Sequence, residues 1–501
     1  MAFKQTSASG LAFVALLTAA SCFSDIDLHT AEDTATGARP GRAGYGGRVC
    51  TPALSLLGLP YTSVVGSGTA ASCTEAALRD AVNKGGHIGF RCGVAPVTVQ
   101  VSAPLHVRSE TSIDGANTVT ITGAKRSAVF IVESLQNLRL ERLEILSGVT
   151  STPSGGGAIS SDKSGTIEAL DVTFRDNENI SDDPALDRSA GGVSVRDSDV
   201  VFENCRFVGN RGGVGAAVGG NYSNITVSNC SFITNTTNDT GAGAGVSVVG
   251  MRQGKGSLRI CGSLFSGNLA RQGGAVYTCG FDADQVEIDR STFTENGATF
   301  QGGAIWSGCN GRAVIRSVSA VGNFAEGYGG ALWLQGPYPI VENSTLANNY
   351  TKMEGRVGGG IFVEGEGVTL RSVTLAKNQA FYSGAIFHKS ANANACLIVN
   401  NKATNPYNVM HGCNVKFASS SENYVFPATV LSSDPNNQPC DAVEDDRDPQ
   451  LGEPGWHGGP TTSLPVGTGS PAATFVRECL PADQGGQMRV SPCTAGAWET
   501  R

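Results

Sequence analysis

The chain has 501 residues, and its charged residues (Asp, Glu, Lys and Arg) make up only 16 % of them, with a net charge of −8. Its 66 glycines follow no three-residue period and its prolines number only 20, which excludes a collagen, while the lack of heptads excludes a coiled coil. A hydrophobic fraction of 40 % excludes a disordered chain, and the mildly acidic balance offers no basic surface for nucleic acid, so we expect no such partner.

The N-terminus has the order of a secretory signal. Lys4 is followed by an apolar run that is too short to span a bilayer, and then by small residues. Cys22 directly follows Ala-Ala-Ser, which resembles the cleavage box of bacterial lipoproteins, although ordinary signal-peptidase cleavage near Ala20 is the alternative. We therefore expect a signal peptide at 1–21 and an N-terminal tether at 22–72. The mature protein is then a lipoprotein of the cell surface or outer membrane, or else secreted.

The cysteines favour disulfides. There are 14 of them and no CxxC pair, so in an exported protein a zinc site has little support. Setting Cys22 aside leaves an odd number, so at least one thiol stays unpaired. Five local pairs are compatible with the spacing: Cys73 with Cys92, Cys205 with Cys230, Cys279 with Cys309, Cys396 with Cys413, and Cys479 with Cys493.

Two interleaved repeats dominate the middle of the chain. A small-residue unit ends in an aliphatic residue every 25 to 34 positions, at Ile159, Val193, Val218, Val246, Val276, Ile305, Leu332, Ile361 and Ile386. An apolar residue followed three places later by asparagine recurs between these units, from Phe174/Asn177 to Leu375/Asn378. Short β-branched runs separated by Gly and Asn turns predict strands without helices. We therefore predict an all-β fold, a parallel β-helix of about 9–11 coils at 97–401, with one turn-binding asparagine in each coil.

The alternation of GGA-aliphatic with FxxN resembles the repeats of chlamydial polymorphic outer-membrane proteins and of the wider bacterial right-handed β-helix (pectin-lyase-like) surface proteins. The stretch 73–83 resembles the helical opening of that group, which implies an N-terminal cap with a short helix at 73–96. Asp448-Pro-Gln-Leu-Gly and the ending Gly-Ala-Trp-Glu499 resemble its closing segment, which implies a disulfide-containing cap at 402–501. The chlamydial proteins end in a translocating barrel, but no long alternating strands with aromatic girdles follow residue 401, so self-export is not implied.

The residue after each repeated aliphatic should point outward, because side chains alternate along a strand. This column begins with four small residues and ends with five aromatic ones: Tyr277, Trp306, Trp333, Phe362 and Phe387. Stacked coils would align these rings in a ladder about 19 Å long, and an exposed strip of that kind marks a ligand surface. We predict ligand binding there, with two alternatives: a loop or the segment after residue 401 covers the rings, or an inverted register buries them.

Chemistry has few candidates. β-Helices are common among polysaccharide lyases, and by that resemblance a pectate-lyase-like site needs acidic calcium ligands and a strong base. Asp282 and Asp284 with Arg290 are the weak catalytic candidates, and the weak metal candidates are Asp182, Asp183 and Asp187. No grouping repeats on a neighbouring coil, so we interpret them as solvated turn residues. We expect no metal or cofactor, or calcium if the chain is an enzyme. Histidine is scarce, and only His388 and His457 merit attention.

The sequence thus favours a non-catalytic, exported β-helix protein of the cell surface. We expect a monomer that binds an extracellular glycan or a surface protein, in the manner of an adhesin, and that meets the membrane only through an N-terminal lipid. The alternatives are a polysaccharide lyase or related carbohydrate-active enzyme, and a purely structural spacer.

Overall fold

The computed structural model describes residues 50–181, 189–252, 256–281, 283–427, 439–442 and 444–500. The expected signal peptide and lipidation site at Cys22 lie outside these residues, as do four of the acidic candidates, Asp182, Asp183, Asp187 and Asp282. No helix within the described ranges is long and apolar enough to cross a membrane.

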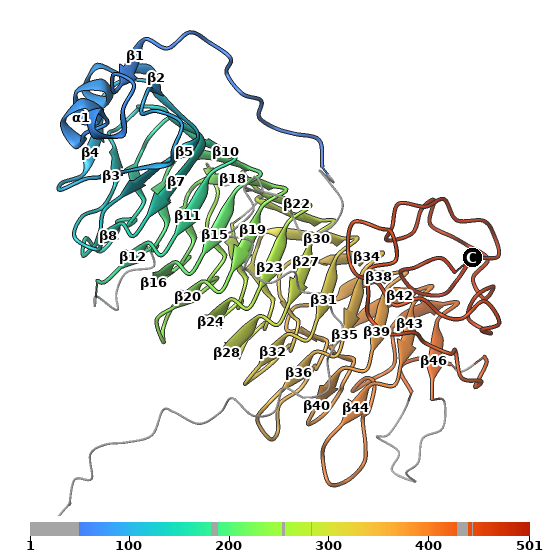
Figure 1. The fold of residues 1–501 in the computed structure, drawn as a ribbon. Helices are drawn as coiled ribbons and strands as arrows, with labels where there is room; N and C mark the ends of the chain where they lie inside the picture. The colour runs from blue at the N-terminus through green and yellow to red at the C-terminus, as the bar shows by residue number, and fades with distance from the viewer. Residues whose placement is uncertain are drawn as a thin grey trace, which may run out of the picture. The chain divides into compact units, whose positions relative to one another are not determined.

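A helix stands before the coils, as the sequence predicts. In α1 (Glu75–Lys84), Thr74 is the N-cap and its hydroxyl accepts a hydrogen bond from the backbone N–H of Ala77 at 3.2 Å. A short 3₁₀-helix, η1 (Ala70–Ser72), precedes it. The buried face of α1 includes Leu78 and Val82. It packs against β1 (Ser63–Val65), β2 (Gly86–Phe90) and β4 (Leu105–Val107) at the N-terminal end of the fold (Figure 1).

Each coil contributes strands to three parallel sheets. The coil from β13 (Val193–Arg196) passes through β14 (Asp199–Glu203) and β15 (Arg206–Val208) to β16 (Arg211–Gly212). Every one of these strands pairs in register with its counterpart one coil later. Because each strand pairs with the matching strands of the coils before and after it, the sheets run lengthwise along the solenoid (Figure 1).

Sheet A has 25 strands in two columns that meet at a bend. Its first column consists of β1 (Ser63–Val65), β2 (Gly86–Phe90), β5 (Thr111–Thr122), β7 (Leu138–Leu146), β10 (Thr166–Leu170), β14, β18 (Asn224–Ser228), β22 (Ser257–Cys261), β26 (Gln285–Asp289), β30 (Arg312–Arg316), β34 (Ile340–Glu342), β38 (Val368–Arg371), β42 (Ala391–Asn394) and β45 (Ser419–Ser421). The long strands β5 and β7 run through both columns. The second column adds β3 (Val97–Gln100), β11 (Thr173–Arg175), β15, β19 (Ser231–Ile233), β23 (Leu264–Ser266), β27 (Thr292–Thr294), β31 (Ser319–Val321), β35 (Thr345–Ala347), β39 (Thr374–Ala376), β43 (Leu397–Val399) and β46 (Tyr424–Phe426).

Sheets B and C form the other sides of the coil. Sheet B has 11 strands: β4 (Leu105–Val107), β6 (Phe130–Val132), β9 (Ile159–Asp162), β13, β17 (Val218–Asn221), β21 (Val246–Val249), β25 (Val276–Gly280), β29 (Ile305–Cys309), β33 (Leu332–Leu334), β37 (Ile361–Val363) and β41 (Ile386–Phe387). Sheet C has 10: β8 (Val149–Thr150), β12 (Glu178–Asn179), β16, β20 (Thr236–Thr237), β24 (Leu269–Gln272), β28 (Gly297–Gln301), β32 (Phe324–Ala325), β36 (Tyr350–Thr351), β40 (Gln379–Ala380) and β44 (Lys402–Ala403).

The solenoid has about 13 turns, slightly more than the 9–11 coils expected. The additional turns lie at its ends, where the repeat is weak. β1 and β2 already pair with sheet A before the expected start at residue 97, and β45 and β46 extend sheet A beyond residue 401.

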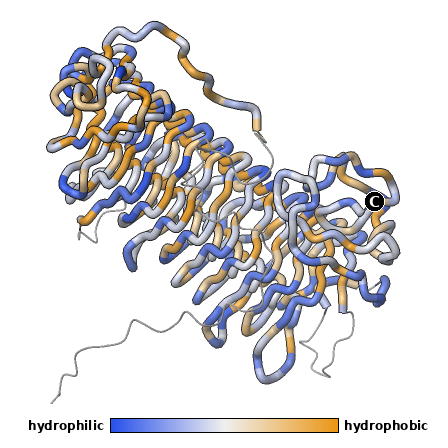
Figure 2. The backbone as a smooth tube through the Cα atoms, in the orientation of Figure 1, coloured by the Kyte–Doolittle hydropathy of each residue, from blue (hydrophilic) through white to orange (hydrophobic). Residues whose placement is uncertain are grey.

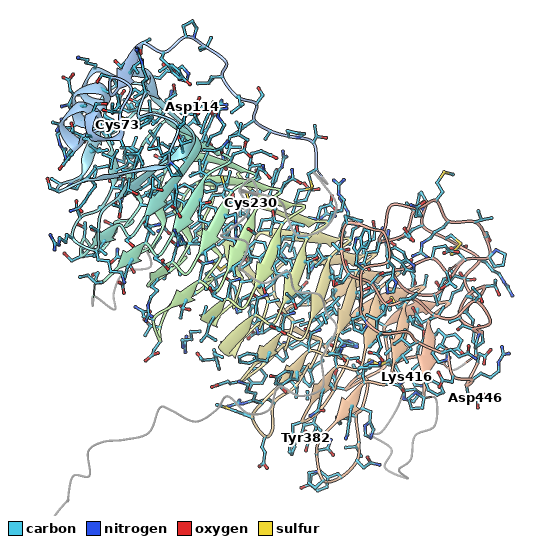
Figure 3. The ribbon with its side chains drawn as sticks, in the orientation of Figure 1. Cys73, Asp114, Cys230, Tyr382, Lys416 and Asp446 are labelled. Carbon is cyan, nitrogen blue, oxygen red and sulfur yellow. A yellow bond between two sulfur atoms is a disulfide. The ribbon has the colours of Figure 1, made fainter. Side chains whose placement is uncertain are left out.

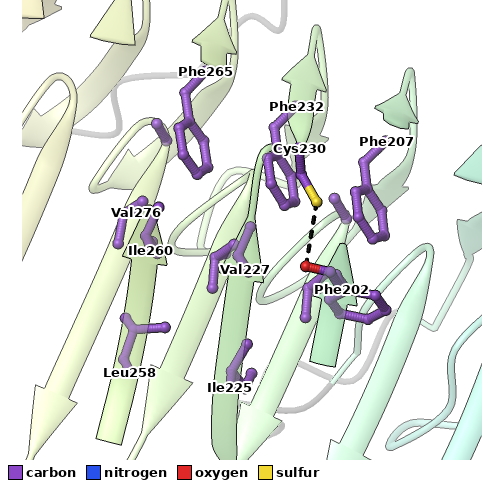
Figure 4. Packing of buried hydrophobic residues seen from close by; sticks show 14 of the residues in the cluster. Phe202, Phe207, Ile225, Val227, Cys230, Phe232, Leu258, Ile260, Phe265 and Val276 are labelled. Carbon is purple, nitrogen blue, oxygen red and sulfur yellow. Dashed lines mark hydrogen bonds between the residues drawn. The ribbon is translucent and has the colours of Figure 1, made fainter. Parts of the chain in front are cut away.

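The interior is filled by columns of apolar side chains that align from coil to coil (Figure 4). Hydropathy alternates along many of the strands (Figure 2). In β26, for example, Val286 and Ile288 are buried while the residues beside them are not. The apolar residues of the asparagine unit stack ring on ring at centroid separations of 4.6–4.8 Å, and their members are Phe174, Phe207, Phe232, Phe265 and Phe293. Beyond Phe293 the column continues with smaller side chains, beginning at Ala320 and Leu346.

The asparagine column has the structural role expected for it. The backbone N–H of Asn235 donates to the Oδ1 of Asn268 at 3.1 Å, and its side-chain amide donates both to that oxygen and to the carbonyl of Phe207. The same pattern runs from Asn177 to Asn401. Each amide is therefore fully used in joining one coil to the next, which leaves none for a ligand.

Five disulfides within the described residues indicate an oxidising, extracellular setting. Three join expected partners: Cys73–Cys92, Cys279–Cys309 and Cys479–Cys493. The other two, Cys50–Cys261 and Cys413–Cys440, were not expected.

Two of the expected pairs are wrong. Cys205 and Cys230 are buried thiols on adjacent coils. Side chains that stack in register lie about 4.8 Å apart, beyond the Cβ separation of about 3.8 Å that a disulfide needs. Cys396 is a buried thiol at the bend of sheet A, whereas Cys413 pairs with Ile386 beside sheet B, on another side of the coil. Burial raises the pKa of Cys396 to about 12.

The chain before β1 forms a strap, residues 50–61, along the outer side of the bend in sheet A (Figure 1). It runs against the order of the coils, from the Cys50–Cys261 disulfide to the hydrogen bond between the hydroxyl of Tyr61 and Asp114. The strap occupies part of the stretch that the sequence assigns to a tether.

The described part of the C-terminal segment packs on the second column of sheet A. Leu464 lies against Val321, Ala347 and Ala376, and the Oε1 of Gln484 accepts a hydrogen bond from the hydroxyl of Thr345 at 2.6 Å. This segment therefore covers sheet A near the C-terminal end of the solenoid.

Candidate functional site

The outer face of sheet B carries two columns of side chains. One is the column after the repeated aliphatics, and the pairing register aligns its members from Ile131 through Ser160 and Ser194 to Gly219. The other lies two residues further along each strand, where Asp162, Arg196 and Asn221 follow one another. Because these columns face away from the core, the size of their side chains determines where this outer face is hollow and where it is filled.

A groove of about 650 Å³ lies over the N-terminal half of this face. Its lining includes Ile131, Ser160 and Ser194 from the strands, together with the stretch 149–155. Side chains at 160, 194 and 219 are small, so nothing on these strands fills the space above the sheet. These small residues can be seen in the sequence, but the sequence alone does not predict a groove above them.

The stretch 149–155 is held in place as one wall of the groove. The side-chain amide of Asn179 donates to the carbonyls of Thr152 and Gly155 at 3.0 and 2.7 Å. The hydroxyl of Ser194 donates to the carbonyl of Ser154 at 3.0 Å, which ties the wall to the strand beneath it. The groove is therefore formed before any ligand arrives.

The charged residues of the groove are balanced. Arg196 Nε and Asp162 Oδ1 are 2.8 Å apart, and their side chains are 34 % and 65 % exposed. Glu133 Oε1 lies 2.8 Å from Nδ1 of His106. Arg126, the fourth charged residue of the lining, is exposed. Two positive and two negative side chains thus accompany ten serine and threonine residues in the lining.

The five predicted aromatics form the expected ladder on the C-terminal half of the same face. Trp306 stacks on Tyr277 and on Trp333 with centroid distances of 4.4 Å on both sides. Phe362 follows at 6.4 Å and Phe387 at 5.4 Å beyond it. The inward neighbours of these residues line the core, so the register is not inverted.

The ladder is nevertheless more enclosed than a solvent-facing strip. Trp306 and Trp333 are only 7 % and 2 % exposed. The ring faces are covered by one another, and the Trp306 ring leans over Gly308, where a Cβ would lie 2.4 Å from its Cη2 atom. The described C-terminal segment contacts sheet A instead. The ladder is covered by Tyr328, whose ring lies 5.1 Å from that of Phe362, and by the Cys279–Cys309 disulfide, both of which belong to the same cluster. Ring faces stacked in this way are not free to receive a sugar.

The described acidic candidates have structural partners. Asp284 is buried, and its two carboxylate oxygens accept backbone N–H groups from Met251, Gly256 and Phe281. Arg290 donates from Nε to the neighbouring Asp289 at 2.8 Å. No group of three or more His, Cys, Asp or Glu side chains that could hold a metal ion occurs within the described ranges. The structure therefore assembles no metal site from the candidates it describes.

The two histidines have different surroundings. His388 is fully buried and stacks on Phe417 at 5.5 Å, and burial lowers its pKa to about 4. His457 lies in the C-terminal segment, 6.1 Å from the Trp498 ring. Neither residue lines the groove.

Comparison with known proteins agrees with this architecture. A family model described as a right handed beta helix region matches residues 118–319. The predicted fold class, a right-handed parallel β-helix, is therefore confirmed. No curated protein sequence matches the chain.

Solved structures are similar only at low identity. An alginate lyase, AlyF-OU02, has 10 % identity and a TM-score of 0.42, covering 77 % of this chain and 90 % of its own. Tailspike protein 3 of bacteriophage CBA120 has 13 % identity and a TM-score of 0.40, covering 84 % of this chain and 64 % of its own.

Proposed function

We propose that the protein is an exported, non-catalytic β-helix of the cell surface that binds an extracellular polysaccharide in the groove over the N-terminal half of sheet B. The observation that carries the proposal is the groove itself, a preformed hollow of about 650 Å³ in which ten of the 23 lining residues are serine or threonine. Sugar hydroxyls pair well with serine and threonine, whose hydroxyls both donate and accept hydrogen bonds, with carboxylates, which accept, and with guanidinium groups, which donate.

The position of the groove further supports this proposal. The hollow runs across β6, β9, β13 and β17, four successive strands of one sheet. Three coil spacings amount to about 14 Å, which is long enough for several sugar units. An extended polymer with a repeating unit suits a surface that itself repeats from coil to coil.

Export is supported by the five disulfides and by the signal-like N-terminus. Attachment through a lipid on Cys22 belongs to the proposal and can be tested separately. Metabolic labelling with a radioactive fatty acid should label the wild-type protein and not the Cys22→Ala variant.

The binding proposal can be tested by filling the groove. Aromatic rings already occupy the same outward column at Trp306 and Trp333, so this column accepts tryptophan. Ile131→Trp and Ser160→Trp should therefore fold, fill the hollow and weaken the retention of polysaccharide in affinity electrophoresis by at least about tenfold.

The matched control is Phe387→Trp, which introduces the same residue in the same column but far from the groove. It should leave retention unchanged. If the wild-type protein retained no polysaccharide, or if the two groove variants retained it as well as the control, the proposal would be wrong.

A further inference from the structure

We infer that the groove selects a neutral polysaccharide rather than an acidic one, an inference that rests on the proposed function. It concerns the class of the ligand, which neither the fold nor the volume of the groove determines. The charges and hydroxyl groups that line the groove carry the argument.

The formal charges of the side chains that line the groove sum to zero. Arg196 is neutralised by Asp162 at 2.8 Å. Glu133 lies beside His106, and Arg126 contributes a single positive charge that offsets the negative charge of Glu133. A site for a polyanion concentrates positive potential along its length, because every repeating unit of the ligand brings another negative charge. This groove offers no such excess.

An acidic polymer would also have to compete for Arg196. Each carboxylate or sulfate that approached this side chain would meet Asp162, which is 65 % exposed and lies on the adjacent strand. Like charges at such a distance repel one another, so the pair disfavours an anionic ligand. The same pair suits a neutral diol, since the carboxylate accepts from one hydroxyl while the guanidinium donates to another.

The neighbouring side chains extend this neutral, hydrogen-bonding surface. Ser160 and Ser194 lie on the floor, where their hydroxyls bond the carbonyls of Gly156 and Ser154, and Thr150 and Thr152 lie in the wall. Uncharged polar side chains therefore surround the ion pair of Arg196 and Asp162. We expect affinity to depend on hydrogen bonds and to change little with salt concentration, unlike the affinity of a polyanion site.

Asp162→Asn provides the sharpest test, because it leaves Arg196 unpaired and gives the groove a net positive charge. The wild-type protein should retain neutral glucans, mannans, galactans or xylans equally at low and high salt, and should not retain alginate, pectate or glycosaminoglycans. Asp162→Asn should gain salt-sensitive retention of one of these acidic polymers, with a Kd about three- to fivefold lower than that of the wild type.

Asp446→Asn is the matched control. It makes the same change in net charge on an exposed residue of the C-terminal segment, distant from the N-terminal end that Asp114 marks in Figure 3. It should not gain retention of acidic polymers.

The outcomes separate this inference from the proposed function. Salt-sensitive binding of an acidic polysaccharide by the wild type, abolished by Ser160→Trp, would overturn the neutral class and leave the groove as the site. Equal gains in Asp162→Asn and Asp446→Asn would likewise overturn the inference, since the groove charge would not be responsible. A failure to retain any polysaccharide would overturn both proposals.

Discussion

The strap makes a specific prediction about stability. Cys50→Ser together with Cys261→Ser removes the disulfide that fixes residue 50 to the end of β22, across a sequence separation of 211 residues. In the chain-entropy description, a loop of that length contributes about 5 kcal/mol, against about 3 kcal/mol for the 14-residue separation of Cys479 and Cys493. The strap disulfide should therefore be the larger contributor of the two.

Loss of this disulfide should also release the strap. Its remaining attachments include hydrogen bonds to buried carboxylates: the backbone N–H of Ala53 donates to Glu203 at 3.2 Å, and that of Leu57 donates to Glu141 at 3.1 Å. Asn229 also bonds the backbone of Cys50, and Arg139 donates to the carbonyl of Ser55. Each bond to a carboxylate contributes about 1.5–3 kcal/mol, while ordering one residue of backbone costs about 1–2 kcal/mol. A strap of twelve residues, 50–61, therefore depends on its disulfide.

Urea unfolding followed by intrinsic fluorescence, and limited proteolysis of the folded protein, measure both effects. We expect the double variant to lose up to about 5 kcal/mol of unfolding free energy and to be cleaved within residues 50–61. Cys479→Ser with Cys493→Ser is the control, which should lose less and keep the strap protected. Wild-type stability together with an uncleaved strap in the Cys50 variant would refute the reasoning.

Two further predictions concern buried rings. Burial holds the pKa of His388 at about 4 against an ordinary 6.5, so the unfolded chain binds a proton that the folded chain does not; its contribution is full above pH 6.5 and falls by about 3 kcal/mol towards pH 4. Leu334 occupies the matching position of β33, so we choose the variant His388→Leu. This variant should lose less unfolding free energy than the wild type between pH 6.5 and pH 4 in urea titrations. An unchanged pH dependence would contradict the assignment to His388. Trp333→Ala should cost about 3–5 kcal/mol in unfolding free energy yet leave polysaccharide retention unchanged, because its ring is buried in the ladder; weakened retention in a folded variant would return the site to the ladder.

The repeat made the coil predictable from the sequence. An asparagine such as Asn268 recurs at one position per coil because each amide bonds to the next, and this requirement leaves a periodic mark that can be read without coordinates. The alternation of inward and outward side chains also correctly placed Trp306 on the outer face and Ile305 in the core. Local contacts of this kind are encoded within about one repeat of the chain.

The remaining features depend on contacts outside the repeat. Cys261 bonds to a residue 211 positions away, and no local spacing could distinguish that partner. Exposure of the ladder was overestimated because alternation gives the direction of a side chain but not what lies beside it, and Trp333 is covered by its own neighbours. The groove was missed because a hollow depends on the wall at 149–155 as well as on small floor residues.

The groove and the ladder lie over two different stretches of the same column of outward-facing residues. A coil contacts only its neighbours, so the outward residue of each strand can change without altering the core. Where this residue is Ser160 or Ser194 the face is hollow, and where it is Trp306 or Trp333 the rings fill the face and bury one another. The stacked half therefore contributes apolar burial that the hollow half forgoes. The groove ends on β17, one strand before β21 with its small residue Ser247, and the aromatic residues begin with Tyr277 on β25.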